Sequence, residues 1–316
     1  MSLESKISVL QDRAYMLAKA RQFFAEKNIM EVDCPALTKG SPIDQHIDVM
    51  SLSFPGGEKR HLYTSPEYGM KRLLADGIGD IYQICHVFRS GESGHLHNPE
   101  FTMVEWYQNG IPFSQIIEET LSFIKLFLGD LPHQIFSYRD LLKKYFELDY
   151  LHATCAELLA ACEKYDLPKA SDMKSWDKDT LLQYMVSFYI EPKLGVNEFT
   201  VINYFPASQA ALSKTLTIGE EPVAERFEIY YQGIELCNGF HELTDAKEQE
   251  KRFVRQNELR KSIGKDELPI DTFFLEALEK GLPDCCGVAV GFDRLMLLKH
   301  KKATIQEVIP FSWEIA

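Results

Sequence analysis

Residues 88–107 read FRSGESGHLHNPEFTMVEWY, and this stretch decides the fold class. An extended run at 80–89 leads into it, and a second extended run at 100–107 follows a loop containing glycine and proline. Two such runs predict an antiparallel pair of strands with a long connection. Side chains alternate between the two faces of a strand. One face of the second strand therefore carries Phe101, Met103, Glu105 and Tyr107.

Towards the N-terminus the sequence predicts helices. The opening segment has apolar residues at steps of three, four and seven, which indicates one apolar helical stripe. The stripe consists of Leu3, Ile7, Leu10, Ala14, Leu17 and Phe24. A second helix is predicted over 66–75, with proline in its first turn and Gly77 and Gly79 ending it. We expect a strand to follow.

Towards the C-terminus the pattern becomes helical and then returns to strands. Four helical segments are predicted between residues 114 and 190, and we interpret 111–197 as a helical insertion. The later elements are strands at 198–205 and 224–240, a charged helix at 246–261, and a final strand and helix within 286–299.

Composition limits the class of protein. The chain has 316 residues, 45% hydrophobic and 26% charged, as expected for one large enzyme core or a core with an insertion. A net charge of −13 disfavours a nucleic-acid partner unless a local basic patch overrides it. Seven cysteines without CxxC spacing, no signal-peptide pattern and no apolar run of roughly 18 residues predict a cytoplasmic protein away from membranes.

A hairpin is predicted in ERFEIYYQGIELCNGFHEL, residues 225–243, with its turn at Gln232-Gly233. Counting outward, Glu228 faces Cys237, so Glu228 and Glu235 are diagonal neighbours about 7–8 Å apart. A pair of carboxylates on one face is suited to Mg²⁺, which takes oxygen ligands. A solvated acidic face explains the same residues, and the two interpretations stay open.

Asn238 and Glu242 have the opposite parity from Glu235 along this strand. Strict alternation therefore sends them to the other face. A bulge at Gly239 would return them, because glycine in a strand often marks a bulge. The pattern leaves both arrangements open.

Basic residues gather at two glycine-containing turns. Arg89 ends a strand beside the loop with His97, and Phe101 begins the returning strand. Such a loop could bind a nucleotide, with the positive charge on its phosphates and the aromatic ring on its base. A surface ion pair is the alternative for a strand arginine. In GVAVGFDRLMLL, residues 287–298, Gly291 precedes Arg294 at a strand-to-helix junction that admits close backbone approach to phosphate.

Three stretches in order carry a resemblance to class II aminoacyl-tRNA synthetases. Residues 26–37, EKNIMEVDCPAL, resemble motif 1 with its interface proline, Pro35; residues 88–107 resemble motif 2 and residues 287–298 motif 3. YTSPEYGMKRLL, HNPEFTMVEWY and GIELCNGFHELTDA indicate the lysine branch. The resemblance implies an α+β fold, with an antiparallel sheet flanked by helices, in a single catalytic domain over 1–316 that forms a homodimer through motif 1.

Within this branch the chain resembles the elongation factor P–(R)-β-lysine ligases, synthetase paralogues that modify a protein instead of a tRNA. The opening helix leads directly into motif 1, so we expect no N-terminal anticodon-binding OB-fold and no tRNA partner. The resemblance implies ATP and Mg²⁺, with (R)-β-lysine as substrate and a lysine ε-amine of elongation factor P as acceptor. We keep two alternatives: a free-standing lysine-activating enzyme that charges tRNA or a small amine, and a non-catalytic synthetase-like regulatory subunit.

The resemblance also implies roles for individual residues. Arg89 and Arg294 are the expected catalytic residues, on the phosphates of ATP, and Phe101 stacks on adenine. The expected ATP-binding residues are Arg89, Ser90, Gly91, Glu92, His97, Asn98, Phe101, Glu235, Leu236, Gly291 and Arg294. The expected substrate-binding residues are Ser65, Pro66, Glu67, Tyr107, Asn238, Glu242 and Ala289, and the expected metal ligands are Glu228 and Glu235.

Motif 2 departs from the family at one position. The family reads Arg-x-Glu, whereas this chain has Arg89, Ser90, Gly91 and Glu92, so glycine stands where the glutamate belongs. Either Glu92 reaches the adenine edge after a one-residue adjustment that Gly91 permits, or backbone groups read that edge alone.

Overall fold

The computed structural model describes residues 3–316, and the chain divides into two compact units. The first unit comprises the residues up to Gly129 together with Glu242–Ala316. The second unit is Asp130–His241. Each unit is described by itself below, and the single catalytic domain expected from the sequence stays a prediction.

The sheet of the first unit contains the strand pair predicted from residues 88–107. Its strands are β1 (Met30–Glu31), β5 (Ile81–Phe88), β6 (Glu100–Asn109) and β12 (Cys285–Gly291), in the order β1-β5-β6-β12. β6 is antiparallel to both β5 and β12, whereas β1 is parallel to β5. A second, antiparallel sheet of β2 (Leu37–Thr38), β4 (Lys59–Leu62) and β3 (Met50–Ser53) was not predicted.

Helices in the first unit begin with α1 (Leu3–Glu26), as predicted, but the buried face of α1 differs from the predicted stripe. The buried residues are Val9, Arg13, Met16, Ala20 and Phe24. Ile7 is 47% exposed, and Ala14 is exposed as well. The physical reason is Arg13: its guanidinium pairs with a buried aspartate, and this ion pair turns a charged position inward. The side chain of Leu3 lies outside the described part of the chain.

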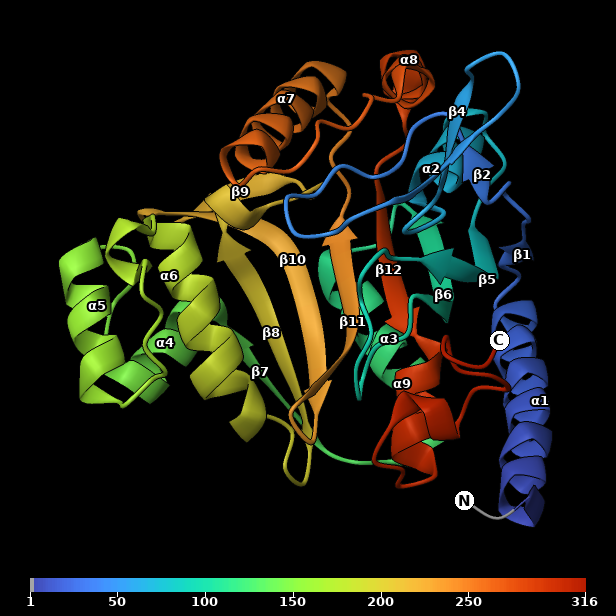
Figure 1. The fold of residues 1–316 in the computed structure, drawn as a ribbon, viewed down its shortest axis with the longest axis horizontal. Helices are drawn as coiled ribbons and strands as arrows, with labels where there is room; N and C mark the ends of the chain where they lie inside the picture. Colours follow the sequence, from blue (N-terminus) through green and yellow to red (C-terminus); the bar gives the residue numbers. More distant parts are fainter. Residues whose placement is uncertain (1–2) are drawn as a thin grey trace. The chain divides into compact units, whose positions relative to one another are not determined.

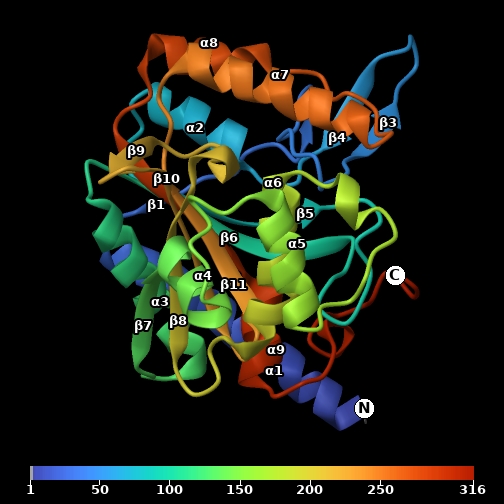
Figure 2. The same ribbon diagram turned by 90° about the vertical axis from the view of Figure 1, so that its left-hand side faces the viewer.

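Three helices of the first unit form one layer, visible in Figures 1 and 2. They are α2 (Glu67–Ala75), α7 (Ala246–Ser262) and α8 (Thr272–Gly281). The ring of Tyr68 stacks on Phe274 with centroids 4.4 Å apart, and Phe253 lies 5.7 Å from Tyr68. α2 and α7 were predicted, but α8 was not. The remaining long helices are α3 (Phe113–Leu128) and α9 (Phe292–Lys299).

The second unit contains strands in the order β11-β10-β8-β7, with β9 (Thr215–Ile218) on β10. Its strands are β11 (Ile234–His241), β10 (Glu221–Tyr231), β8 (Phe199–Pro206) and β7 (His133–Ser137). α4 (Tyr138–Phe146), α5 (Cys155–Lys164) and α6 (Lys178–Met185) share a buried core with strand residues such as Ile202 and Phe205.

The predicted insertion at 111–197 has different contents in the structure. All four predicted helical segments are present. The first of them, α3, belongs to the first unit, and β7 lies between α3 and α4. Helical periodicity identified the helices but gave no signal for the short half-exposed strand.

The β10–β11 hairpin confirms the predicted turn and corrects its register. Gln232 and Gly233 have φ of 51° and 72°, as a two-residue turn requires, and Tyr230 lies opposite Glu235. Next along the ladder, however, Ile229 pairs with Cys237, so Leu236 is an extra residue. The bulge is therefore at Leu236 and not at Gly239.

This bulge changes which side chains are neighbours. Glu228 lies opposite Asn238 instead of Cys237. Because the extra residue reverses parity, Glu235 and Asn238 share the face of Glu228. Leu236 is buried, which gives the bulge an apolar anchor.

Candidate active site

One face of the β5-β6-β12 sheet carries three of the predicted site residues, Phe101, Tyr107 and Ala289. Across the strands, Phe101 pairs with Val87, Glu105 with both Gln83 and Ala289, and Tyr107 with Gly287. A strand rises about 3.3 Å per residue, so Phe101 and Glu105 are about 13 Å apart along β6. The face is thus long enough to hold a nucleotide at one end and an amino acid at the other.

At the Phe101 end of the face, the side chains of Arg89 and Phe101 come together as predicted. The Arg89 guanidinium lies 5.1 Å from the centroid of the Phe101 ring, and its Nη1 lies 3.8 Å from Oε2 of Glu92. The buried Nε of Arg89 has no hydrogen-bond partner among the described residues. The backbone N–H of Arg89 donates to the carbonyl of Pro99 at 2.9 Å, which fixes the base of the loop.

Arg294 and His97 also come together, with Nη2 2.8 Å from Nε2. Because a guanidinium only donates, the imidazole accepts through Nε2. Asp293, next to Arg294 in α9, accepts hydrogen bonds from Arg13 at 2.5 Å and from the backbone N–H of Thr102 at 2.8 Å. This buried pair links the start of α9 to the strand that carries Phe101.

The loop residues of motif 2 are held mainly through backbone and amide contacts. The N–H of Ser90 donates to the carbonyl of Asp48 at 2.8 Å. The Asn98 side chain donates to the Glu100 carbonyl at 2.7 Å and accepts from the N–H of Trp313 at 3.0 Å. Gly91 has a φ of +78°, a left-handed conformation that glycine adopts without strain. The glycine that departs from the family pattern therefore fits the turn it occupies.

At the other end of the face, a polar cluster surrounds Glu105. Its Oε2 accepts from the hydroxyl of Ser65 at 2.8 Å, and its Oε1 accepts from the hydroxyl of Tyr107 at 2.6 Å. The Ser65 oxygen also accepts the N–H of Glu67 at 3.0 Å, at the start of α2, where Pro66 is the N-cap. Glu105 was noted in the sequence only as a neighbour of Tyr107 and was not predicted as a site residue.

Lys71 joins two further carboxylates to this cluster. Its Nζ lies 2.6 Å from Oε1 of Glu67, one turn earlier in α2, and 2.5 Å from Oε2 of Glu242. The other oxygen of Glu242 is buried without a hydrogen-bond partner among the described residues. A Cβ on Gly287 would lie 2.6 Å from this oxygen and 2.3 Å from the Tyr107 ring. Gly287 therefore keeps the space beside both side chains open.

The buried carboxylates have raised pKa values. Burial raises the pKa of Glu105 to about 7, with Glu67 adding to the shift and hydrogen bonds from Tyr107 and Ser65 opposing it. Burial raises the pKa of Glu242 to about 8, although Lys71 opposes the shift. Near neutral pH these carboxylates therefore hold protons, and a nearby cation would favour their ionised form.

The hairpin residues of the second unit form their own cluster. Glu228 accepts from Arg226 at 2.6 Å and from the hydroxyl of Tyr230 at 2.6 Å, and Arg226 also donates to the side-chain oxygen of Asn238 at 3.1 Å. Burial raises the pKa of Glu228 to about 7, with Arg226 opposing this and Glu235 adding to it. Glu235 and Glu228 thus interact electrostatically across the hairpin, as predicted.

The carboxylates of Glu228 and Glu235 are ligands of the kind that Mg²⁺ prefers. Two carboxylates are a usual protein contribution to a magnesium ion, which takes its other ligands from water and substrate phosphates. Within residues 3–316, no group of three or more histidine, cysteine or acidic side chains is arranged to hold a metal by itself. A role for Glu228 and Glu235 as metal ligands stays a prediction.

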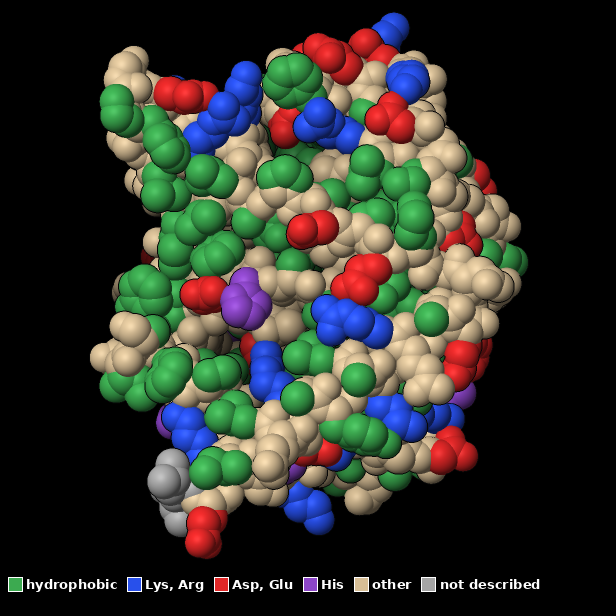
Figure 3. Space-filling model, turned by 90° about the vertical axis from the view of Figure 1, so that its right-hand side faces the viewer, with side chains coloured by type: hydrophobic (Ala, Val, Ile, Leu, Met, Phe, Trp, Pro, Cys, Tyr) green, Lys and Arg blue, Asp and Glu red, His purple; other side chains and the backbone are tan. Residues whose placement is uncertain are grey.

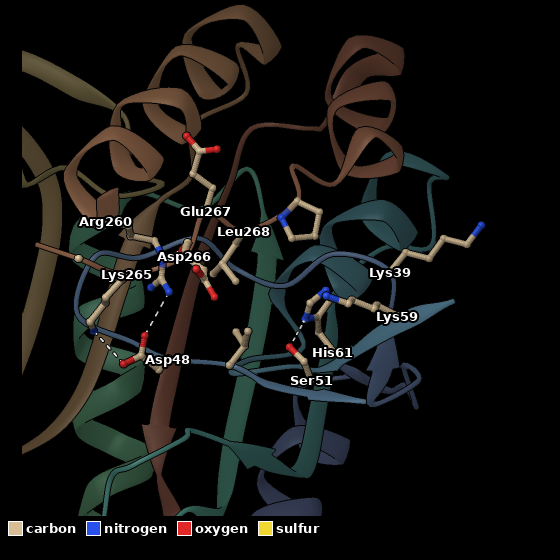
Figure 4. A pocket seen from close by; sticks show the side chains of 13 residues that line it. Lys39, Asp48, Ser51, Lys59, His61, Arg260, Lys265, Asp266, Glu267 and Leu268 are labelled. Carbon is tan, nitrogen blue, oxygen red and sulfur yellow. Dashed lines mark hydrogen bonds and ion pairs between the residues drawn. The ribbon is translucent and has the colours of Figure 1, made fainter. Parts of the chain in front are cut away.

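A separate groove of about 910 Å³ lies between the 39–61 segment and the end of α7 (Figure 4). Its charged side chains largely engage one another: Asp48 lies 3.1 Å from Arg260 and 2.9 Å from Lys265. Ser51 and His61 are hydrogen-bonded at 2.9 Å. None of the predicted site residues lines this groove. It supports the site indirectly, since the Asp48 carbonyl that receives the Ser90 N–H lies in its wall.

The mixed helix and sheet content, the mostly antiparallel strands and the two-ended face define a class II synthetase catalytic fold. The chain belongs to the family described as tRNA synthetases class II (D, K and N), which matches residues 2–314. The α+β fold class and the family resemblance predicted from the sequence are therefore confirmed.

Within this family the chain is similar to curated proteins named elongation factor P–(R)-β-lysine ligase. The protein of that name from Haemophilus ducreyi is 43% identical over 317 residues, covering 99% of this chain and 96% of the relative. The one from Salmonella paratyphi B is 42% identical over 313 residues, covering 98% and 96%. In the described part of the chain, no helix has the length and apolar character needed to cross a membrane.

Proposed function

We propose that this chain is an ATP-dependent, AMP-forming ligase that activates (R)-β-lysine and transfers it to a lysine ε-amine of elongation factor P. The names of relatives at 42–43% identity over nearly the whole chain support the choice of reaction and acceptor. The structure supports a substrate with two amino groups, and this is the observation that carries the proposal.

That observation is the pocket at the Glu105 end of the sheet face. Glu67, Glu105 and Glu242 are all at least nine-tenths buried and converge around Ser65 and Tyr107. Buried carboxylates are costly unless cations or hydrogen-bond donors meet them. A diamino acid supplies two ammonium groups, and its carboxylate then lies toward the arginines at the other end of the face.

The first step forms an acyl-adenylate. A carboxylate oxygen of the amino acid attacks the α-phosphorus of ATP, the bond to the bridging oxygen breaks, and pyrophosphate leaves. Arg89 and Arg294 are the groups that stabilise charge on the phosphate oxygens, since their guanidinium groups donate in fixed directions. Bound Mg²⁺, which we assign to Glu228 and Glu235, would add further positive charge at the phosphates.

The second step transfers the acyl group. The ε-amine of the acceptor lysine, once deprotonated, attacks the acyl carbon, an amide bond forms, and AMP leaves with the electrons of the broken mixed-anhydride bond. Arg294 is kept in position for both steps by its contact with His97 and by the Asp293–Arg13 pair beside it. No residue of the chain is assigned as the base for the amine.

ATP–pyrophosphate exchange tests the proposal. We expect exchange that requires Mg²⁺ and is more efficient with (R)-β-lysine than with α-lysine, followed by a mass increase of elongation factor P by one β-lysyl group. Equal or greater efficiency with α-lysine would favour the free-standing lysine-activating enzyme. Binding of ATP without any exchange would favour the regulatory subunit.

We further propose a homodimer formed through the α1 face. Apolar side chains gather on the side of the molecule shown in Figure 3. Large exposed ones include Tyr15 at 56% and Met30 at 45%, and Pro35 is exposed as well. Exposed apolar patches usually mark interaction sites, and motif 1 lies here. All seven cysteines are free thiols, which fits a reducing, cytoplasmic location.

A further inference from the structure

Lys71 lies in the stretch YTSPEYGMKRLL, but the sequence predicted no role for it and the proposed mechanism does not use it. It lies in the middle of α2, at a position that reads as an ordinary solvent-exposed helix lysine. In the structure it is 1% exposed. Its ammonium contacts Glu67 and Glu242 and lies 5.8 Å from the centroid of the Tyr107 ring and 5.9 Å from that of Phe274.

The surroundings of Lys71 are almost entirely anionic or neutral. Glu67 faces it from α2, Glu105 and Tyr107 from β6, Glu242 from the segment after β11, and Cys285 from β12. Burial raises the pKa values of the Tyr107 hydroxyl and the Cys285 thiol, so both are neutral at physiological pH. When all three carboxylates are ionised, the single ammonium of Lys71 leaves this group of residues with a net charge of −2.

We propose that Lys71 is a built-in counter-ion of the amino-acid pocket: it orients Glu67 and Glu242 and sets the pocket charge to the value that a substrate with two ammonium groups neutralises. This inference rests on the proposed function, because it takes the Glu105 end of the sheet face as the amino-acid site. Lys71 acts through the carboxylates and is a positioning residue, which also determines specificity.

The charge balance explains how the site would distinguish amino acids with two ammonium groups from those with one. With a diamino acid bound, all three carboxylates can ionise, because the two substrate ammonium groups and Lys71 match them one for one. An amino acid with a single ammonium leaves one carboxylate unmatched, and that carboxylate must keep its proton or remain as an uncompensated buried charge. Without Lys71 the same pocket keeps a proton even when a diamino acid is bound.

The test is the pH profile of catalytic efficiency for (R)-β-lysine in pyrophosphate exchange, with ATP saturating. Lys71 lowers the pKa of Glu242, so Lys71→Met should move the acid limb to higher pH by about one unit or more. Each unit corresponds to a roughly tenfold loss of efficiency on that limb. Lys71→Arg keeps the charge and should restore the wild-type midpoint, while the KM for ATP stays unchanged in both variants.

Lys27→Met is the matched control, because Lys27 also pairs with a largely buried carboxylate, Glu119, at 3.0 Å. It should leave the acid limb in place. The opposite outcome is that Lys71→Met lowers the catalytic efficiency equally at every pH and leaves the midpoint of the acid limb at its wild-type value. That result would show that Lys71 only packs the core and would overturn the proposal.

A second measurement needs no substrate. The folded-state pKa of Glu242 lies above its unfolded value, so its contribution to stability is lost as pH rises through the folded value. Without Lys71 that loss extends to higher pH, and the gap in melting temperature between wild type and Lys71→Met should widen between pH 7 and pH 9. A constant gap would refute the counter-ion role. This result is independent of exchange activity, so a failure of the proposed function would be recognised separately.

Discussion

Glu242 combines full burial with a partly unsatisfied carboxylate, and its substitution separates the two substrates. We expect the Glu242 carboxylate to face a substrate ammonium, and Glu242→Gln removes its charge. The charge-assisted hydrogen bond that is lost is worth about 1.5–3 kcal/mol. The KM for (R)-β-lysine should rise about ten- to a hundred-fold, with the KM for ATP nearly unchanged. Pyrophosphate exchange with each substrate varied in turn measures both constants. A rise confined to the KM for ATP would place Glu242 in the nucleotide site.

Ala289 offers a second test at single-residue resolution. It lies opposite Glu105 on β12, half-buried, and packs against the cluster of Tyr63, Val87 and Met103. On this face the methyl group of Ala289 occupies space beside Glu105 that a glycine would leave open. One methyl rarely discriminates by more than about 1–3 kcal/mol.

We therefore expect Ala289→Gly to relax selectivity toward α-lysine by about ten- to a hundred-fold, with a smaller loss of β-lysine activity. The measurement is the ratio of the two catalytic efficiencies. If Ala289 only packs the strand, the variant loses activity for both isomers in parallel, through a destabilisation of about 0.5–1 kcal/mol. An unchanged ratio would remove Ala289 from the specificity determinants and leave the ligase proposal standing.

Some of the candidate site residues could be predicted from the sequence and others could not, for physical reasons. Arg89, Phe101 and Arg294 lie next to glycine-containing turns, and such turns can be recognised directly in the sequence. Glu105 was recoverable, because alternation places it on the same face as Tyr107. Lys71 was not, since its burial depends on Glu242, which is distant in sequence, and on a face of α2 that only the packed structure defines.

At the level of elements, β-strand register is where local patterns fail. The turn at Gln232-Gly233 needs two residues with positive φ, and this pair of residues predicts it from the sequence. The bulge at Leu236 depends on burying that leucine, so the glycine nearby was a misleading signal. α1 shows the same limit: its periodicity predicts a helix, but the Arg13–Asp293 pair decides which face is buried.

The β12–β6 strand pair gives an element-scale prediction at Gly287. A Cβ there would lie 2.3 Å from the Tyr107 ring and 2.6 Å from Glu242, closer than side chains approach. Gly287→Ala should therefore displace both residues, destabilise the fold by about 1–3 kcal/mol and raise the KM for the amino acid more than that for ATP. Gly94→Ala is the control, because a Cβ at Gly94 meets nothing within 4 Å. Thermal melting with exchange kinetics tests both, and a Gly287→Ala enzyme with wild-type constants would contradict the arrangement described here.

At the scale of the whole molecule, charge and apolar surface act in opposite directions on self-association. Each chain carries a net charge of −13, so two copies repel each other at long range. The apolar side chains of the α1 face, Ile7, Tyr15 and Met30 among them, must supply the attraction. Salt screens the repulsion over a Debye length of about 8–10 Å at physiological strength but leaves apolar burial intact.

The dimer should consequently tighten as salt rises, which is opposite to the behaviour of an interface held by ion pairs. Tyr15→Glu places a charge from each copy into this face and should weaken association by about 2 kcal/mol or more, the scale of an aromatic interface anchor. Sedimentation equilibrium over a range of salt concentrations measures both effects. Phe188→Glu is the control, because Phe188 is just as exposed, at 57%, but lies on the α6 side of the second unit. A wild-type chain that stays monomeric at every concentration would refute the homodimer, and a dimer that loosens with salt would move its interface away from the α1 face.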